Sequence, residues 1–204
     1  MPSRLYRRLV QRYCDVLAQR PWTTQAATSA LLWGAGDIAA QRVESSHADK
    51  PAAALDVRRA SLVTLYGGAF IGPLGHAWLE ALEHGTRRAG LAGGSSRAIA
   101  AKLVADTLLF GPVHVASFFG LMGVVSGETL EVVTQRLRDK FWPTLLAESV
   151  GWPAVQGINF AYVPVQHQLL VVNVVSLVDC TFLSWVKHHD MGHGFLRGAG
   201  PFGP

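Results

Sequence analysis

Polar side chains that can bind or pass small polar molecules follow one edge of an otherwise apolar stretch, residues 149–168. The stretch contains no Asp, Glu, Lys or Arg, yet Trp152, Gln156 and Asn159 recur at the spacing of one helical face. Glu148 lies one turn earlier on the same face. Because a polar group without a partner in hydrocarbon is costly, we expect this edge to face protein or water rather than lipid.

Two roles are open for this polar edge. It can line a water-filled path, a role that Glu148 favours because an ionisable group at membrane depth is a functional candidate. It can also join helices through hydrogen bonds, each of which contributes about 0.6–2 kcal/mol in a membrane. The chain has no Gly-x-Ser-x-Gly elbow, no P-loop and no Cys-x-x-Cys pair. We therefore expect neither enzymatic activity nor a cofactor.

Three aspartates can join the polar edge in an acidic interior that would favour cations or repel anions. They are Asp37, Asp106 and Asp179. For Asp37 and Asp106 we prefer the alternative, in which each lies near the end of a membrane span or pairs with a base such as Lys102 or Arg42.

Histidines give weaker signals of chemistry. His76 and His114 can act as proton-sensitive gates, although such histidines are more often structural groups. His189 and His193 have the spacing of metal ligands on a helix, but the glycines that flank His193 disfavour a helix there. We expect no metal site.

The composition indicates a membrane protein. Of the 204 residues, 50% are hydrophobic and only 16% are charged, whereas about 25% of residues are charged in a soluble domain. The mean hydropathy is +0.24. The chain is basic, with a pI of about 9.4, but its basic residues are scattered over the ends of apolar runs. They are typical of headgroup anchors, and we expect no nucleic-acid partner.

Five apolar runs alternate with polar segments. They cover residues 22–40, 60–82, 98–125, 142–164 and 165–186. Prolines that should kink or end helices lie in three of them, at Pro73, Pro112, Pro153 and Pro164. Gly-Pro followed by His occurs in both the second and third runs, a match too short to define a repeat. The sequence predicts an all-α bundle of four or five kinked transmembrane helices.

Three further segments differ from this bundle, which we place at residues 21–189. Residues 1–20 form a basic amphipathic segment with five arginines and one aspartate, typical of a helix lying on anionic lipid or of a mitochondrial presequence. Residues 128–141 have the pattern of an amphipathic helix at the membrane interface. Residues 190–204 form a Gly-rich tail.

The string Trp152-Pro153-x-x-Gln156-x-x-Asn159-Phe160-x-x-Val163-Pro164 resembles the signature of the peroxisomal 22-kilodalton membrane protein / Mpv-17 family. Shorter matches follow in the expected order over about residues 5–186. They include Gly36-Asp37, Asp56 with Arg58 and Arg59, Gly72-Pro73 with His76 and Trp78, Trp142-Pro143, and Phe182-Leu183-Ser184. Asp106-Thr107 departs from the family's usual Asp-Gln, and Gln168 stands where an arginine is common.

The resemblance implies a small integral membrane protein of an organelle. Members are associated with the passage of small solutes and with the homeostasis of mitochondrial membranes. We therefore expect a channel-like path for small hydrophilic solutes in the mitochondrial inner membrane, with the peroxisomal membrane as the alternative. The expected partners are the lipid bilayer and small solutes, together with further copies of the chain or a larger membrane complex. The competing hypothesis is a non-conducting structural or accessory subunit of such a complex.

Overall fold

The protein is all-helical, as the sequence predicts. The computed structural model describes residues 4–46 and 54–188, and within these ranges no residue lies in a strand. The C-terminal tail at 190–204 lies outside the described residues.

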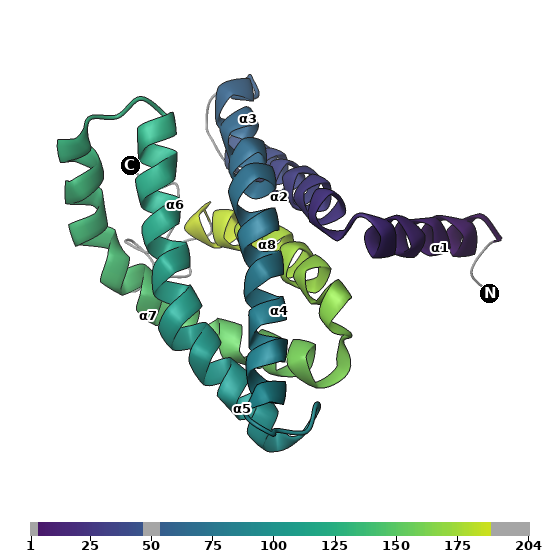
Figure 1. Cartoon of the computed structure of the whole chain (residues 1–204). Helices are drawn as coiled ribbons and strands as arrows, with labels where there is room; N and C mark the ends of the chain where they lie inside the picture. The colour runs from purple at the N-terminus through teal and green to yellow at the C-terminus, as the bar shows by residue number, and fades with distance from the viewer. Residues whose placement is uncertain (1–3, 47–53, 189–204) are drawn as a thin grey trace.

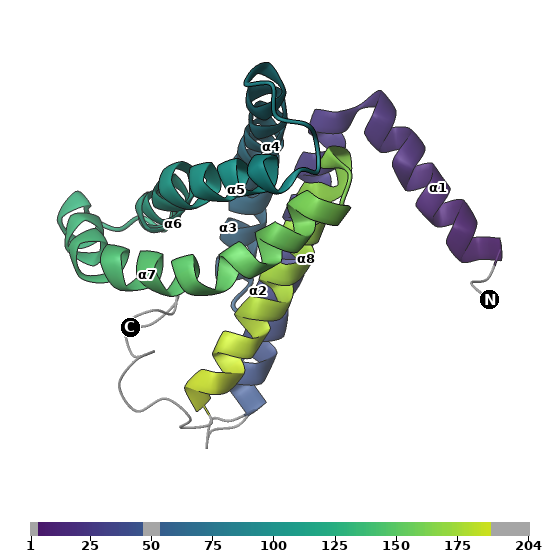
Figure 2. The same ribbon diagram turned by 90° about the horizontal axis from the view of Figure 1, so that it is seen from below.

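The chain begins with a helix that projects away from the rest of the structure. α1 (Arg4–Gln19) and α2 (Pro21–Ser46) meet at Pro21, which begins α2, and α1 points outward in both views (Figures 1 and 2). Of its apolar side chains, Leu17 is buried near α2, while Leu9 and Val16 remain exposed. α1 therefore has the geometry of the amphipathic surface segment that its arginine-rich sequence indicates.

Two helices of similar design follow, and each contains a wide π turn. The first consists of α3 (Val57–Tyr66), η1 (Gly67–Ile71) and α4 (Gly72–Arg88). The second consists of α5 (Ser96–Ala105), η2 (Asp106–Phe110) and α6 (Gly111–Val125).

The two helices share the same order of N-cap, π turn and Gly-Pro pair. Each begins at a side-chain N-cap, Asp56 or Ser95, runs for ten residues, and passes through five π residues before a Gly-Pro pair. A proline ring clashes with the carbonyl one turn earlier in a regular helix, and the wider turn relieves this contact. The short Gly-Pro echo in the sequence thus marks two copies of one helical design.

The fourth apolar run is part of a longer helix than the sequence suggests. α7 (Leu130–Tyr162) includes Pro143 and Pro153 and is bent along its length (Figure 1). The helix predicted at 128–141 is present from Leu130, but the prediction that it is separate is wrong, because it continues into the fourth run. Its place at the membrane interface stays a prediction. A proline removes one backbone hydrogen bond, and a long helix tolerates this loss as a bend. Pro164 is not a kink, since it lies in the turn between α7 and α8.

α8 (Val165–His188) returns alongside α2, and small residues bring helices close together (Figure 2). A Cβ atom at Gly36 would lie 3.4 Å from Cα of Leu177 on α8. At Gly72 it would lie only 2.6 Å from Cα of Ala26, so α4 approaches α2 at backbone distance. Small residues at helix contacts are typical of membrane bundles.

Among the described residues, one continuous helix is long and apolar enough to cross a membrane by length and composition. It spans Ser96–Val125, with a mean hydropathy of 1.9 over its most apolar window, and only 22% of that window is buried. The apolar part of α8, Val165–Val178, is shorter. The count of four or five spans therefore stays a prediction.

Candidate functional site

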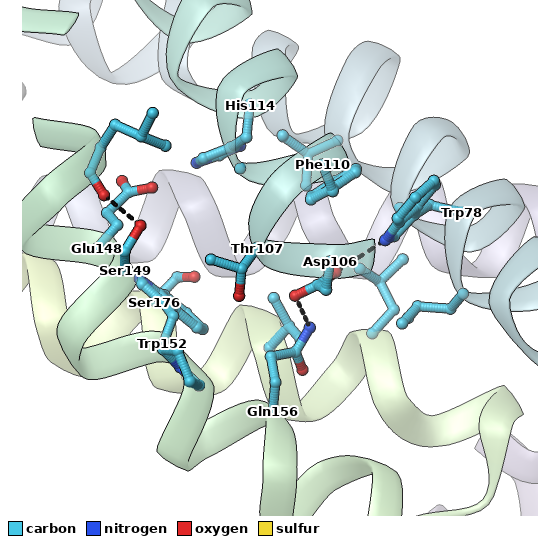
Figure 3. A pocket seen from close by; sticks show the side chains of 18 of the residues that line it. Trp78, Asp106, Thr107, Phe110, His114, Glu148, Ser149, Trp152, Gln156 and Ser176 are labelled. Atoms are coloured by element: carbon cyan, nitrogen blue, oxygen red, sulfur yellow. Dashed lines mark hydrogen bonds between the residues drawn. The ribbon is translucent and has the colours of Figure 1, made fainter. Parts of the chain in front are cut away.

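A cavity of about 90 Å³ lies where η2 and α6 meet α4, α7 and α8 (Figure 3). This volume holds several water molecules. Its walls are mainly apolar and aromatic, with a few polar side chains. The polar and aromatic residues that line it include Trp33, Trp78, Asp106, Thr107, Phe110, His114, Glu148, Ser149, Trp152, Gln156 and Ser176.

Asp106 ties three helices together at one side of this pocket. Its Oδ1 accepts a hydrogen bond of 2.8 Å from Nε1 of Trp78 on α4. Its Oδ2 accepts one of 2.9 Å from Nε2 of Gln156 on α7. Asp106 is the first residue of η2, so the carboxylate sits where the π turn begins. We call these two hydrogen bonds of Asp106 the clasp, and Figure 3 shows it beside Thr107.

Behind the clasp, amide side chains join α7 to α8. Asn159 is fully buried and its Nδ2 donates to Oε1 of Gln156 at 2.9 Å and to the carbonyl of Gln168 at 3.2 Å. Gln168 in turn donates to the carbonyl of Val163 at 2.9 Å. The polar edge of α7 therefore faces protein, as expected from the sequence, but Asn159 stands behind the pocket and does not line it.

Glu148 and Trp152, from the same edge of α7, do line the pocket. Ser149 lies beside Glu148 at one end, and Asp106 with Gln156 lies toward the other (Figure 3). The hydroxyl of Ser149 donates to the carbonyl of Leu145 at 2.7 Å. The edge that the sequence analysis singled out is thus divided between pocket lining and a buried amide network.

A column of rings forms another wall. Trp78 stacks on Phe110 with ring centroids 5.5 Å apart, and Phe110 stacks on His114 at 6.1 Å. Trp33 meets His114 edge-on at 6.1 Å. The Nδ1 atom of His114 is buried without a hydrogen-bond partner among the described residues.

Two of the other candidates lie elsewhere. Asp37 is buried and pairs with Arg59, its Oδ1 lying 2.8 Å from Nε, so it belongs to an ion pair between α2 and α3 rather than to the pocket. Asp37 thus pairs with Arg59 rather than with Arg42, because the start of α3 packs against α2. His76 packs edge-on against Trp22, with ring centroids 4.8 Å apart, and does not line the pocket.

Lys102 does not neutralise Asp106, although it lies one turn earlier in the sequence. Its ammonium group pairs with Glu83, which lies just beyond the apolar run 60–82. The side chain of Asp179 is outside the described part of the structure.

Sequence reasoning missed Trp78 and Thr107 as pocket residues. A tryptophan near the end of an apolar run, such as Trp78, is typical of an anchor at the membrane interface, and Thr107 carries no charge. Both lie near a Gly-Pro pair, since Trp78 follows Pro73 by five residues and Thr107 precedes Pro112 by five.

Comparison with known proteins identifies relatives along most of the chain. Residues 123–184 match the model of the Mpv17 / PMP22 family. The chain is 36% identical to protein sym-1 of Neurospora crassa, over 86% of this chain and 96% of the relative. It is 29% identical to the mitochondrial inner membrane protein Mpv17 of Danio rerio, over 87% and 96%. It is 32% identical to peroxisomal membrane protein 2 of Bos taurus, over 88% and 90%. No solved structure matches it.

Proposed function

Because this chain belongs to the Mpv17 / PMP22 family of membrane proteins, we propose that it provides a path for small hydrophilic solutes through an organelle membrane. We place it in the mitochondrial inner membrane, as the name of the Danio rerio relative suggests. The name of the Bos taurus relative supports the peroxisomal membrane as the alternative. The proposed bundle has four or five spans.

The observation that carries this proposal is a pocket with polar groups inside helices whose outer faces are apolar. Asp106, Thr107 and Glu148 line the cavity. On the outer surface, Leu108 is 67% exposed and Val150 is 81% exposed. This distribution suits a lipid environment, in which polar side chains face a protein interior or a water-filled space.

The lipid bilayer is the first proposed partner. On α1, Arg7, Arg8 and Arg12 are exposed together with the apolar Leu9 and Val10. A helix of this kind lies in the plane of an anionic membrane, with its apolar side chains below the headgroups. The orientation of α1 away from the bundle leaves these side chains available for lipid.

Cysteine substitutions in the pocket test the path directly. Ser149→Cys and Ser176→Cys change one atom at two lining positions, in a background without the native Cys14 and Cys180. We expect a thiosulfonate reagent to lower solute flux into liposomes that carry these variants by at least about tenfold, because the modified side chain fills a cavity of about 90 Å³.

The matched control is Ser61→Cys, an exposed position on α3 outside the pocket. Modification there should leave flux unchanged. Equal inhibition at all three positions, or flux that survives full modification of both pocket cysteines, would refute a path through this cavity.

A non-conducting role is the second candidate, and the amide network favours it. Asn159 and Gln168 are buried and hydrogen-bond across the contact of α7 with α8, which is the work of structural groups. In this case the chain would be a structural or accessory subunit of a larger membrane complex. Stoichiometric co-purification with other subunits, together with no flux from the isolated protein, would decide for it.

A further inference from the structure

We infer that the pocket binds small organic cations with a guanidinium or alkylammonium group, and that Asp106 supplies the counter-charge. This inference rests on the proposed function, for which it names the class of solute. It is carried by the partners of Asp106, by the backbone around η2 and by the walls of the cavity.

The charge of Asp106 is not cancelled by the groups that bind it. Both of its oxygens accept hydrogen bonds from neutral donors, the indole of Trp78 and the amide of Gln156. The nearest base in the sequence, Lys102, pairs with Glu83 instead. Glu148 adds a second carboxylate to the lining, which contains no Lys or Arg among the described residues. An anionic solute would meet the charge of Asp106 in a low-dielectric space and be repelled.

The backbone of η2 has one hydrogen-bond donor fewer than a regular helix at its end. The N–H of Gly111 bonds to the carbonyl of Asp106, five residues earlier. The next residue, Pro112, has no N–H. The carbonyl groups of Thr107 and Leu108 therefore share one donor fewer than in an uninterrupted helix. Thr107 lines the pocket, so one of these two carbonyl groups belongs to a residue of the pocket wall.

The walls favour an organic cation over a metal ion. Among the described residues no three His, Cys, Asp or Glu side chains gather to hold a metal. Apolar and aromatic groups such as Phe110, Leu145 and Leu169 form most of the lining, and they cannot replace the water shell of a strongly hydrated ion. Guanidinium is flat and weakly hydrated, and its N–H groups match the geometry of carboxylates. A volume of about 90 Å³ suits such a group.

Guanidinium and urea provide a matched pair of probes. They have the same planar shape and the same number of non-hydrogen atoms, but only guanidinium is charged. Equilibrium dialysis with each labelled compound at millimolar concentration, using the full chain in lipid nanodiscs, should show guanidinium binding at least about tenfold more tightly than urea. Nitrate, a flat anion of the same size, should not compete.

Asp106→Asn should weaken guanidinium binding at least about tenfold and leave urea unaffected. Asp139→Asn is the control, because it removes the same charge from an exposed position on α7. If Asp106→Asn does not fold, Ser149→Lys places a cation at the pocket and should likewise abolish guanidinium binding. Equal binding of guanidinium and urea, or unchanged guanidinium binding in either folded pocket variant, would overturn the inference.

Flux measurements on the same protein separate the two proposals. Guanidinium binding that depends on Asp106, without flux of any solute into liposomes, would refute the path and keep the cation site. Flux that is blocked at the pocket but is equal for guanidinium, urea and nitrate would keep the path and refute the cation site.

Discussion

Replacement of Gln156 by leucine should destabilise the bundle more than any comparable change at its surface. Leucine has a similar volume, so the main loss is that of two buried hydrogen bonds. One joins Gln156 to the carboxylate of Asp106 at 2.9 Å, and the other joins it to Asn159 at 2.9 Å. A hydrogen bond to a charged group contributes about 1.5–3 kcal/mol and a neutral one about 1 kcal/mol in water-soluble proteins.

In a membrane the same bonds contribute less, on average about 0.6 and at most about 1.7 kcal/mol each, because the unfolded chain also finds partners there. Asn159 keeps one partner, the carbonyl of Gln168. Among the described residues, Asp106 keeps the indole of Trp78 as its one remaining donor. We therefore expect the free energy of unfolding to fall by about 2–3 kcal/mol, near the upper end of the membrane range.

The chain offers a matched control on the same helix. Gln135 also donates to an aspartate carboxylate, that of Asp139, at 3.0 Å, but both side chains are exposed. Gln135→Leu should cost about 0.5 kcal/mol or less. Reversible unfolding in mixed micelles, followed by circular dichroism, measures both variants. If Gln156→Leu is no more destabilising than Gln135→Leu, the clasp at Asp106 does not hold the helices together.

Two further predictions concern helix contact and acid stability. Gly72→Ala should lower the thermal midpoint by an amount equivalent to about 1–3 kcal/mol, because the new Cβ would lie 2.6 Å from Cα of Ala26, whereas Gly85→Ala, with no atom within 4 Å, should be neutral or stabilising. Equal midpoints for both variants would contradict the close approach of α2 and α4. The hydrogen bond from Lys102 holds the pKa of Glu83 below its usual value, so this pair stabilises the fold at neutral pH and stops doing so as the pH falls from about 4.5 through the lowered pKa. Thermal unfolding between about pH 7 and about pH 3 should show a smaller loss of stability in acid for Glu83→Gln than for the original protein. The same loss of stability in both proteins would contradict this prediction.

Local patterns were sufficient to predict the helices and the direction of one polar edge. Apolar runs of helical length and well-placed prolines gave the all-α fold, and the spacing of Gln156 and Asn159 gave a face that must avoid lipid. The internal similarity of the second and third runs was visible only as Gly-Pro. The π turns before each Gly-Pro pair could not be predicted from the sequence, since their width depends on packing along the whole helix.

The lengths of elements were harder to predict than their existence. Residues 128–141 have the amphipathic pattern of an independent helix, and the apolar run that follows was expected to form the next one. In the structure α7 continues through Pro143, because a helix interior can lose one hydrogen bond when neighbouring turns remain intact.

The composition and periodicity of the chain thus fixed what each segment is, because these properties depend on residues within one or two turns of each other. Which segments share a site was settled by folding alone. Asp106 meets Trp78 and Gln156, and Asp37 meets Arg59, across intervals in the chain that no local pattern spans. Small residues such as Gly72 let two helices approach closely, and this approach decides which side chains meet. The approach depends on both helix surfaces, so the sequence of one helix cannot predict it.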